Sequence, residues 1–350
     1  MSRRERPATA PRLAPGDHTP QFVLPDTEGK TFEFYSAVTG RPVVMIFAGP
    51  RGLTDLAAAG ISPATLDATK VQVVTLVPGD PQAAARQARQ AGWTQRTLAD
   101  PNGEVTQGFA EFSGVTPPAI YVLDPNQRVS AIAAADQVAG DFAAWIDRAL
   151  ADAAFRGEPA VVQRAAPVLL VPRALEPEDC DWLIGLWRRG EKEAGQVAVG
   201  ASSGGGLSVV HTTKRREDYY IRDPEQHQRL VQRLMPRLVP EIAKNLHFDG
   251  FALETFKIGC YKAEQAGFFN VHRDDTSPAT KNRKFAMTLN LNTGEYEGGD
   301  LRFPEYGPDL YRPPKGAAVL FSCSMLHEVV PVTKGERFVL LTFLITPPGR

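Results

Sequence analysis

Cysteine is scarce in this chain of 350 residues. The only three, Cys180, Cys260 and Cys323, are an odd number at wide spacing, which excludes a disulfide framework and a Cys-x-x-Cys metal or redox site. Because structural disulfides are typical of oxidising compartments, their absence favours a reducing, cytoplasmic location.

Long hydrophobic runs are missing as well. The longest run, residues 43–48, has the length of a strand and falls far short of the ~18–20 residues that span a membrane. The first 16 residues are basic but contain no apolar stretch of the kind found in secretion signals. Residues 1–12 are therefore predicted to be a disordered polar tail.

No excess of charge of either sign is present. The chain has 39 Lys and Arg against 40 Asp and Glu, so the formal net charge is -1. This balance removes the electrostatic reason to expect nucleic acid or an anionic membrane as the main partner. Hydrophobic residues make up 43% and charged residues 23%, as in ordinary soluble globular proteins. At roughly 100–200 residues per domain, the length predicts two domains.

The first part of the chain, residues 13–150, alternates strand-like and helix-like segments, which predicts an α/β domain with a sheet between helices. Its apolar runs are continuous, as expected for strands buried on both faces. Gly92 stands just past one helix-like segment, in the usual position of a helix stop. The predicted strands are residues 43–48, 71–77 and 119–123, and the predicted helices are residues 53–66, 82–91 and 141–150.

A Gly-Glu-Pro break within residues 151–165 marks a predicted linker, after which the pattern changes. Residues 176–189 form a predicted amphipathic helix, and residues 224–246 form a second helix that is interrupted at Pro236. Short strands then follow one another, separated by Gly, Pro and Asn turns, which indicates a β-sandwich or barrel such as the jelly roll. This second domain is predicted to span residues 166–347.

His272, Asp274 and His327 form the candidate metal site. In extended backbone, residues two apart point to the same side, so His272 and Asp274 can reach one ion while Asp275 faces away. A second imidazole from a later strand, His327, completes a set of two nitrogens and one carboxylate. Such a set leaves open coordination positions and suits non-haem Fe(II), although zinc in a hydrolase can use a similar triad. The alternative is a turn histidine that is hydrogen-bonded to its neighbouring carboxylate.

Several further segments accompany these residues in order along the chain. They are Asn290-Leu291-Asn292, Glu297-Gly298-Gly299-Asp300, Lys315-Gly316-Ala317, Leu326-His327-Glu328 and Gly335-Glu336-Arg337. Together with residues 168–182, this set resembles the prolyl 4-hydroxylase-like branch of the 2-oxoglutarate- and Fe(II)-dependent dioxygenases. The resemblance covers residues 167–345. It implies an α+β domain with a double-stranded β-helix, or jelly-roll, core.

The resemblance also implies roles for single residues. His272, Asp274 and His327 are expected to bind Fe(II), and Arg337 is expected to pair with the distal carboxylate of the cosubstrate 2-oxoglutarate. Many members have Lys in place of Arg337, but a guanidinium binds a carboxylate through two parallel hydrogen bonds and serves equally well. The carboxylate of Asp274 argues against the halogenases of the superfamily, which lack it. Ascorbate is implied as a reductant that family members often need.

Tyr261 and Thr288 complete the predicted cosubstrate pocket. Tyr261, on the strand before the His-x-Asp loop, is expected either to donate its hydroxyl to the same carboxylate or to be a buried core tyrosine. Ala286 stands where relatives frequently have a Thr that contacts the cosubstrate, and Thr288, on the same side of the strand, is expected to substitute. Phe269 stands three residues before His272, where many relatives carry Tyr; it can wall the pocket but cannot donate a hydrogen bond.

Residues 13–150 resemble the peroxiredoxin and thioredoxin-like family. The resemblance rests on Leu13-Ala14-Pro15-Gly16-Asp17, Gly40-Arg41-Pro42-Val43-Val44 and Thr116-Pro117-Pro118-Ala119, the last of which implies a cis-proline at Pro118. Residues 48–55, where the family places its peroxidatic cysteine, contain none. Peroxide reduction and disulfide exchange therefore lack a nucleophile. We predict a catalytically silent module that holds a partner, a substrate or a second subunit, as in a homodimer.

The sequence supports three functional hypotheses. The leading one is an Fe(II)- and 2-oxoglutarate-dependent hydroxylase that uses O2 on a C–H bond of a peptidyl or small-molecule substrate and releases succinate and CO2. The second is a non-catalytic metal-binding scaffold, favoured by the altered positions Phe269 and Ala286. The third, a thiol-independent oxidoreductase centred on the first domain, is weakened by the missing cysteine. The resemblance does not disclose the prime substrate, because one fold serves many acceptors.

Overall fold

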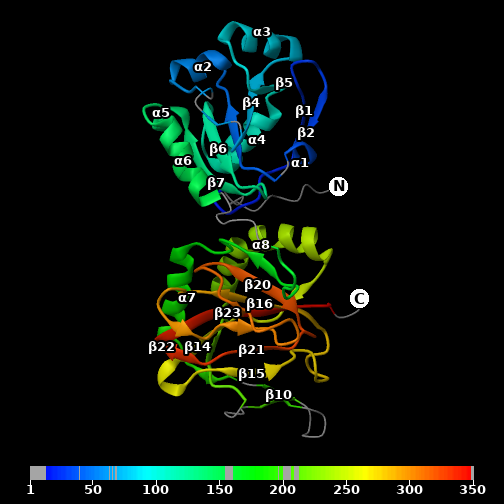
Figure 1. Cartoon of the computed structure of the whole chain (residues 1–350), viewed down its shortest axis with the longest axis vertical. Helices are drawn as coiled ribbons and strands as arrows, with labels where there is room; N and C mark the ends of the chain where they lie inside the picture. The colour runs from blue at the N-terminus through cyan, green and yellow to red at the C-terminus, as the bar shows by residue number, and fades with distance from the viewer. Residues whose placement is uncertain are drawn as a thin grey trace. The chain divides into compact units, whose positions relative to one another are not determined.

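The computed structural model describes residues 13–347 apart from residues 39, 63, 65, 68, 154–160, 196, 200–205 and 209–212. The chain divides into two compact units, Met1–Glu158 and Pro159–Arg350 (Figure 1). The predicted tail, residues 1–12, and part of the predicted linker, residues 154–160, lie outside the described residues. Across the described ranges, no helix combines the length and the apolar character that crossing a bilayer requires.

The first unit contains a five-stranded sheet of β3 (Val43–Phe47), β4 (Gln72–Pro78), β5 (Arg96–Asp100), β6 (Ala119–Leu123) and β7 (Val129–Ala134). Its helices are α1 (Phe34–Ala37), α2 (Leu53–Ala58), α3 (Pro81–Ala91), α4 (Glu104–Ser113), α5 (Ala135–Val138) and α6 (Phe142–Ala153), and β1 (Val23–Pro25) pairs with β2 (Thr31–Glu33). The sheet order is β5-β4-β3-β6-β7, with β3, β4 and β5 parallel and β6 and β7 antiparallel. Helices pack on both faces, so this unit is the predicted α/β layer.

The burial of β3 explains why its sequence is apolar at every position. Val44 and Ile46 pack with α2 and α6 on one face of the sheet. Met45 and Phe47 pack with α1 and α4 on the other face. All four side chains are 0% exposed, because alternate residues of a covered strand lose contact with water on opposite faces. The prediction of a strand buried on both sides is confirmed.

Local sequence sets the helix ends in this unit. The helix predicted over residues 53–66 is shorter, because Gly60 adopts a φ of +71° that a helix cannot continue through. α3 begins after Asp80, whose side chain caps it, and ends at Gly92 in the left-handed conformation. The predicted cis-proline is confirmed at the peptide bond that precedes Pro118.

The second unit contains a large sheet and a small sheet. The large sheet comprises β8 (Leu169–Val171), β9 (Glu193–Ala194), β12 (Glu217–Tyr220), β13 (Ala252–Leu253), β14 (Lys257–Lys262), β16 (Arg283–Asn290), β20 (Ala318–Ser322) and β23 (Glu336–Ile345). Its order is β8-β20-β16-β23-β14-β12-β9, with β13 also paired to β23. The small sheet, in the order β15-β21-β18-β19, comprises β15 (Phe269–His272), β18 (Leu301–Arg302), β19 (Leu310–Tyr311) and β21 (His327–Val329). Two further strand pairs are β10 (Val197–Val199) with β11 (Gly206–Ser208) and β17 (Glu297–Gly298) with β22 (Val332–Lys334).

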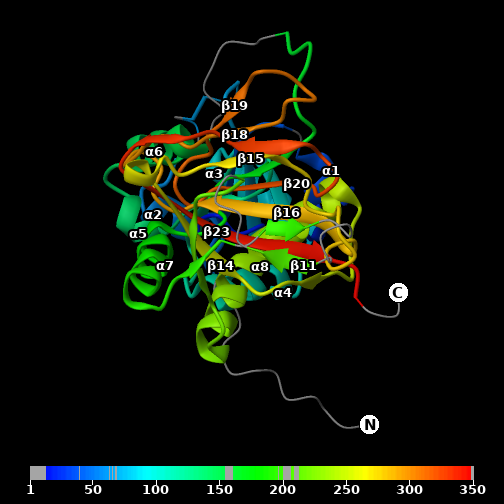
Figure 2. The ribbon, with the colours of Figure 1, turned by 90° about the horizontal axis from the view of Figure 1, so that it is seen from below.

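The large sheet separates two cores. On β23, Phe338 and Leu340 pack with α7 (Pro177–Arg189) and α8 (Pro224–Leu246). Val339 and Phe343 point the other way and pack with residues of the small sheet. Figure 2 shows β15 and β18 of the small sheet lying over β16, β23 and β14 of the large one. Because side chains alternate along a strand, Arg337 on β23 also faces the space between the two sheets.

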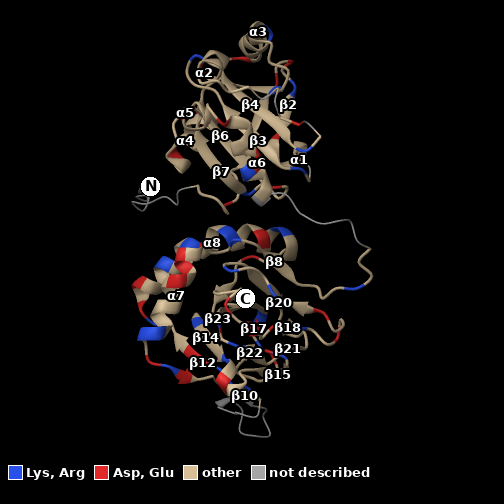
Figure 3. Ribbon diagram, turned by 60° about the vertical axis from the view of Figure 1, so that its left-hand side comes forward, with Lys and Arg blue, Asp and Glu red and all other residues tan. Residues whose placement is uncertain are grey.

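Helix α8 is continuous where the sequence predicted an interruption at Pro236, and it contains Pro240 as well. The prediction of a broken helix is therefore wrong. Packing of its apolar stripe in the core beside the large sheet outweighs the local cost of about 3 kcal/mol for a proline inside a helix. Both α7 and α8 contain Lys or Arg as well as Asp or Glu residues (Figure 3). The buried stripe of α8 consists of Leu230, Leu234, Leu238 and Ile242.

Candidate metal and anion-binding site

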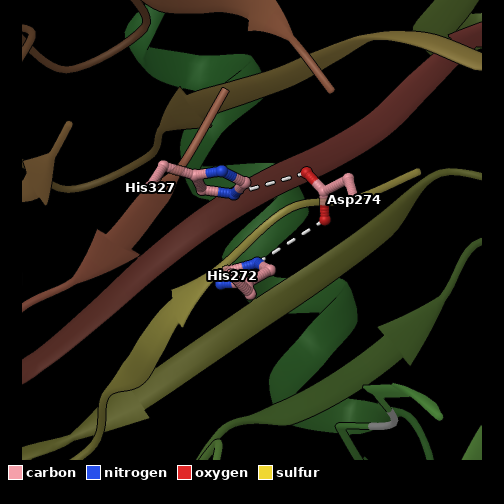
Figure 4. A group of neighbouring side chains, drawn as sticks. All are labelled: His272, Asp274 and His327. Atoms are coloured by element: carbon pink, nitrogen blue, oxygen red, sulfur yellow. Dashed lines mark ion pairs between the residues drawn. The ribbon is translucent and has the colours of Figure 1, made fainter. Parts of the chain in front are cut away.

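The three predicted metal ligands converge at one edge of the small sheet (Figure 4). His272 ends β15 and His327 begins β21, directly opposite each other in the antiparallel register. Asp274 lies in a bend just after β15, with its Oδ1 3.5 Å from His272 Nε2 and its Oδ2 3.3 Å from His327 Nε2. One ligand atom from each residue lies within 4.8 Å of the others, as ligands of a single ion must.

Both imidazoles are oriented through their other ring nitrogen. Nδ1 of His272 lies 2.7 Å from the carbonyl oxygen of Asn270, and Nδ1 of His327 lies 3.0 Å from that of Met325. Because a carbonyl can only accept, Nδ1 carries the proton when the ring is neutral, which leaves the Nε2 lone pair available for an ion. When the ring is protonated, Nε2–H instead donates to Asp274. Histidines anchored in this way are typical of metal ligands. The donor set therefore fits a divalent ion.

Asp274 is positioned by a bend rather than by the extended strand that the sequence suggested. The strand ends two residues earlier, and the Asp274 N–H donates to the carbonyl oxygen of Cys323 at 2.9 Å. Asp275 faces away, as predicted, and accepts a hydrogen bond from the Ser324 hydroxyl. Since Cys323 precedes His327 by four residues, this backbone contact joins the two segments that carry the ligands.

Burial and mutual attraction compete in setting the charges of the triad. Burial favours the neutral form of Asp274, yet attraction to His327 and a hydrogen bond with His272 hold its pKa well below its usual value. Burial also favours neutral His327, but the Asp274 carboxylate outweighs it and raises the pKa of His327. For His272 burial dominates and lowers the pKa. A divalent ion that binds here therefore competes with a proton for His327.

Arg337 lies in the same cavity as the triad, opposite Tyr261 in the register of β14 and β23. It is 2% exposed, and its Nη2 donates to Asn290 Oδ1 at 3.0 Å. In the part of the chain that the structure describes, its Nε has no hydrogen-bond partner, and no carboxylate forms an ion pair with it. A buried guanidinium without a counter-ion is costly. The arrangement therefore fits an anionic ligand.

Sequence reasoning missed a buried ion pair beside Tyr261. Arg216 donates to both carboxylate oxygens of Asp218, at 2.5 and 2.8 Å, and to the Tyr261 hydroxyl at 3.1 Å. Burial opposes both charges, but the pairing overcomes it, so the pKa of Arg216 is raised and that of Asp218 is lowered. Because the Tyr261 oxygen accepts from Arg216, its own proton is free to be donated. The Arg-x-Asp spacing, which puts both side chains on one face of a strand, was the available signal.

Gly259 makes room for this ion pair on the neighbouring strand β14, where it lies directly opposite Asp218. A Cβ at Gly259 would lie 2.7 Å from Arg216 Cδ and 2.9 Å from Arg216 Nε. Real Cβ atoms do not approach other heavy atoms this closely, so any larger residue must displace the guanidinium from Asp218 and Tyr261.

Gly259→Ala is expected to lower the free energy of unfolding by about 1–3 kcal/mol, because the buried pair must shift to accommodate the methyl group. Urea denaturation followed by circular dichroism measures this loss. The matched control is Gly185→Ala in α7, where the added Cβ meets only the flexible end of Arg189 and alanine favours the helix by up to ~1 kcal/mol. Equal destabilisation by the two substitutions would contradict the steric role of Gly259.

A cavity of about 890 Å³ between the two sheets contains the triad and Arg337. Thr288 and Ala286 both line it from β16. Phe269 walls it by stacking on His272, with ring centres 3.4 Å apart. The predicted site residues thus share one cavity, whose size lies within the roughly 300–1,000 Å³ typical of small-molecule sites.

Comparison with known families agrees with the two units. Residues 256–345 match the 2OG-Fe(II) oxygenase superfamily, and residues 15–132 match the AhpC/TSA family. The first match includes His272, Asp274, His327 and Arg337. The chain joins an AhpC/TSA domain to a 2OG-Fe(II) oxygenase domain. The AhpC/TSA domain is thioredoxin-like, and the oxygenase domain carries the candidate site.

Among curated proteins, the chain is 29% identical over 126 residues to a PKHD-type hydroxylase of Synechococcus sp., covering 33% of this chain and 55% of that protein. It is 28% identical over 179 residues to procollagen-lysine,2-oxoglutarate 5-dioxygenase 1 of Mus musculus, covering 47% of this chain and 22% of that protein. The chain thus spans between about a fifth and about half of these relatives. Among solved structures, a Pseudomonas putida prolyl-4-hydroxylase is 22% identical with a TM-score of 0.40, covering 52% of this chain and 94% of that one.

In the AhpC/TSA domain, the segment that lacks the expected cysteine ends at Asp55 in the first turn of α2. Asp55 accepts hydrogen bonds from the backbone N–H of Arg51 at 2.9 Å and from its Nε at 2.6 Å. The backbone hydrogen bond is the main cause that lowers the pKa of Asp55, although burial opposes it. The cysteines of the oxygenase domain are buried free thiols, and burial raises the pKa of Cys180 to about 12. They are therefore poor sources of thiolate.

Proposed function

We propose that the oxygenase domain is an Fe(II)- and 2-oxoglutarate-dependent hydroxylase built on a double-stranded β-helix, or jelly-roll, core. It inserts one oxygen atom of O2 into a C–H bond of a peptidyl or small-molecule substrate, while 2-oxoglutarate takes the other and yields succinate and CO2. The observation that carries the proposal is the buried Arg337, which shares a cavity with the triad and forms no ion pair among the described residues.

Arg337 also favours this function over a zinc hydrolase. A hydrolytic site needs the metal and an activated water but no deeply buried cation facing the same cavity. A dicarboxylate cosubstrate requires such a cation, because its distal carboxylate must be desolvated to bind. A guanidinium can meet a carboxylate with two parallel hydrogen bonds, which fixes orientation as well as charge.

The residues of the chain have separate tasks in this mechanism. His272, Asp274 and His327 would hold the ion, and a ferrous ion bound there would supply open coordination positions and redox chemistry for the cosubstrate and oxygen. Arg337 orients the distal carboxylate of 2-oxoglutarate. Tyr261 donates its hydroxyl proton to the same carboxylate, since its oxygen already accepts from Arg216.

Residues of the cavity wall have further roles in this proposal. Thr288, which is 5% exposed, offers a hydroxyl beside the cosubstrate, where Ala286 offers none. The stacked ring of Phe269 keeps water from one side of His272. Keeping water and protein side chains away from the reacting centre is the part that the protein contributes to such chemistry.

The relatives support hydroxylation in general and leave the acceptor open. They are named as a PKHD-type hydroxylase and a procollagen-lysine dioxygenase, and the chain spans only part of each. We propose in addition that ascorbate sustains turnover by reducing the iron, and that the protein works in the cytoplasm, where its three buried thiols stay reduced. We also propose that the AhpC/TSA domain serves as a binding module, for instance for homodimerisation.

Uncoupled turnover tests the proposed function. We expect anaerobic addition of Fe(II) and 2-oxoglutarate to give a weak visible absorption band that neither component gives alone. Admission of O2 should then produce succinate without any prime substrate, and a chelator added beforehand should abolish both signals. A protein that binds iron but yields neither the band nor succinate would instead be the non-catalytic metal-binding scaffold.

A further inference from the structure

Among the described residues, seven cationic side chains line the cavity of the oxygenase domain, and most of the arginines among them form ion pairs with carboxylates of the protein. Arg216 pairs with Asp218, and Arg283 binds Glu254 at 2.7 and 2.8 Å. Arg222 pairs with Glu193, and Arg273 pairs with Glu305. Arg337 has its proposed role with the cosubstrate. The seven lining cations are Lys214, Arg216, Arg222, Lys257, Arg273, Arg283 and Arg337.

Lys257 is different, because no carboxylate among the described residues forms an ion pair with it. It begins β14 on the same strand face as Tyr261, opposite Leu341 of β23 and Tyr220 of β12. Its ammonium group lies 5.3 Å from the centre of the Phe343 ring. Burial, followed by the charge of Arg216, lowers the pKa of Lys257 to about 8, so the side chain is still mostly protonated at neutral pH.

The position of Lys257 separates it from the cosubstrate cation. Tyr261 is the register partner of Arg337, and Lys257 lies four residues back along the same strand. At ~3.4 Å per residue, the Cα atoms of Lys257 and Tyr261 are about 14 Å apart. The same stretch of the cavity contains Arg283, whose guanidinium carbon lies 3.7 Å from the centre of the Phe343 ring. Arg283 also approaches the carbonyl oxygen of Asp274 at 3.5 Å. Lys257 therefore faces the part of the cavity that leads to the metal ligands.

Charge balance shows what remains to be bound. A ferrous ion, the Asp274 carboxylate, the Arg337 guanidinium and the dianion of 2-oxoglutarate sum to zero net charge. Lys214 also lines the cavity, but burial holds its pKa well below the usual value and so favours its neutral form. The charge of Lys257 is then left over in a cavity from which bound ligands exclude water, where an unpaired ammonium is costly. A ligand that brings one negative charge removes this cost.

We propose that the prime substrate is a small free monocarboxylic acid without an ammonium group of its own, whose carboxylate binds the ammonium group of Lys257. This inference rests on the proposed function and names the substrate class of the same site. The Phe343 ring and the aliphatic part of Lys257 provide an apolar surface for the substrate carbons, and the pairing directs a C–H bond of the substrate toward the triad. A small acid fits the space that a cavity of about 890 Å³ leaves beside the cosubstrate.

The test compares acids with their uncharged counterparts. The probes are the N-acetylated common amino acids as free acids and as carboxamides, and their effects on succinate release are measured with the full chain. We expect at least one free acid to stimulate release with a kcat/KM at least about tenfold above that of its amide, as loss of a charged hydrogen bond implies. In Lys257→Met this preference should fall to within twofold, and Lys257→Arg should restore part of it.

Lys262→Met is the matched control on the same strand, because Lys262 binds Glu217 at 2.9 Å and does not line the cavity. It should keep the preference for acids. In Lys257→Met, uncoupled succinate formation and the half-saturating concentration of 2-oxoglutarate should stay within twofold of the wild-type values. A large rise in the 2-oxoglutarate requirement would place Lys257 with the cosubstrate and overturn the inference.

Calorimetric titration of the same acids and amides provides a readout that needs no turnover. Preferential binding of an acid through Lys257 without any succinate formation would support the anion site but refute the proposed hydroxylase. If uncoupled succinate formation occurs but acids and amides do not differ in turnover or in binding, the proposed substrate class is refuted and the proposed hydroxylase is supported. Stimulation by acetylated aspartyl peptides alone would show that the carboxylate comes from a peptide and would overturn the assignment to a free acid.

Discussion

Replacement of His272 by alanine is expected to abolish iron binding and, with it, succinate formation. Only Asp274 and His327 would remain as ligands, and two ligands hold a ferrous ion poorly in competition with water. Loss of an outer-shell partner alone costs a metal site 10–100-fold in affinity, so loss of a ligand should exceed roughly 100-fold. Iron retained after anaerobic gel filtration, measured by mass spectrometry, checks the first effect, and succinate formation checks the second.

The control for this experiment is a histidine remote from the cavity. His247 caps the C-terminus of α8 with a φ of +46°, and His247→Asn suits the position because Asn tolerates the left-handed region. This variant should keep its iron and its activity. Full iron retention by His272→Ala would contradict the assignment of the triad.

Arg337→Met is expected to raise the 2-oxoglutarate concentration needed for half-maximal succinate formation by roughly 30-fold or more. This figure corresponds to the ~2 kcal/mol at the lower end of the cost of truncating a buried charged pair. Iron binding should be unaffected, because Arg337 contacts Asn290 and no ligand of the triad. Initial rates at varied 2-oxoglutarate, together with iron content, separate the two effects.

The stability of the same variant distinguishes a ligand-binding arginine from a structural one. Since no described carboxylate loses a partner, methionine should leave the melting temperature of the ligand-free chain unchanged or higher. Arg337→Lys keeps the charge but lacks the planar pair of donors, so its 2-oxoglutarate requirement should be intermediate. Parallel loss of iron and of cosubstrate binding in Arg337→Met would contradict the proposed role.

Much of the fold was predictable from the sequence because its signals are local. The apolar run of β3 is buried on both faces, and Asp80 and Gly92 delimit α3. The candidate triad could be predicted for a related reason, since His272 and Asp274 are close in sequence and a motif marks His327. Where a non-local contact decides the structure, as for α8 across Pro236, local rules failed.

The contacts around the site could not be predicted from the sequence, because they too depend on non-local pairing. Arg216 and Asp218 become a buried pair only when β12 aligns with β14 and places them over Gly259. Nothing in the sequence distinguishes Lys257 from the other lysines, because its position in the cavity depends on the register of β14 with β23. Register between distant strands is set by the packing of whole sheets, which a short sequence window does not contain.

The division of the site between two sheets has a consequence for how the domain holds together. All three candidate ligands belong to the small sheet and its adjoining bend, whose strands are only two to four residues long. Such short ladders open at little cost. Arg337, Tyr261 and Lys257 stand on long, doubly paired strands. A bound ion would therefore hold the strands of the small sheet and the bend together. The large sheet would keep its structure with or without the ion.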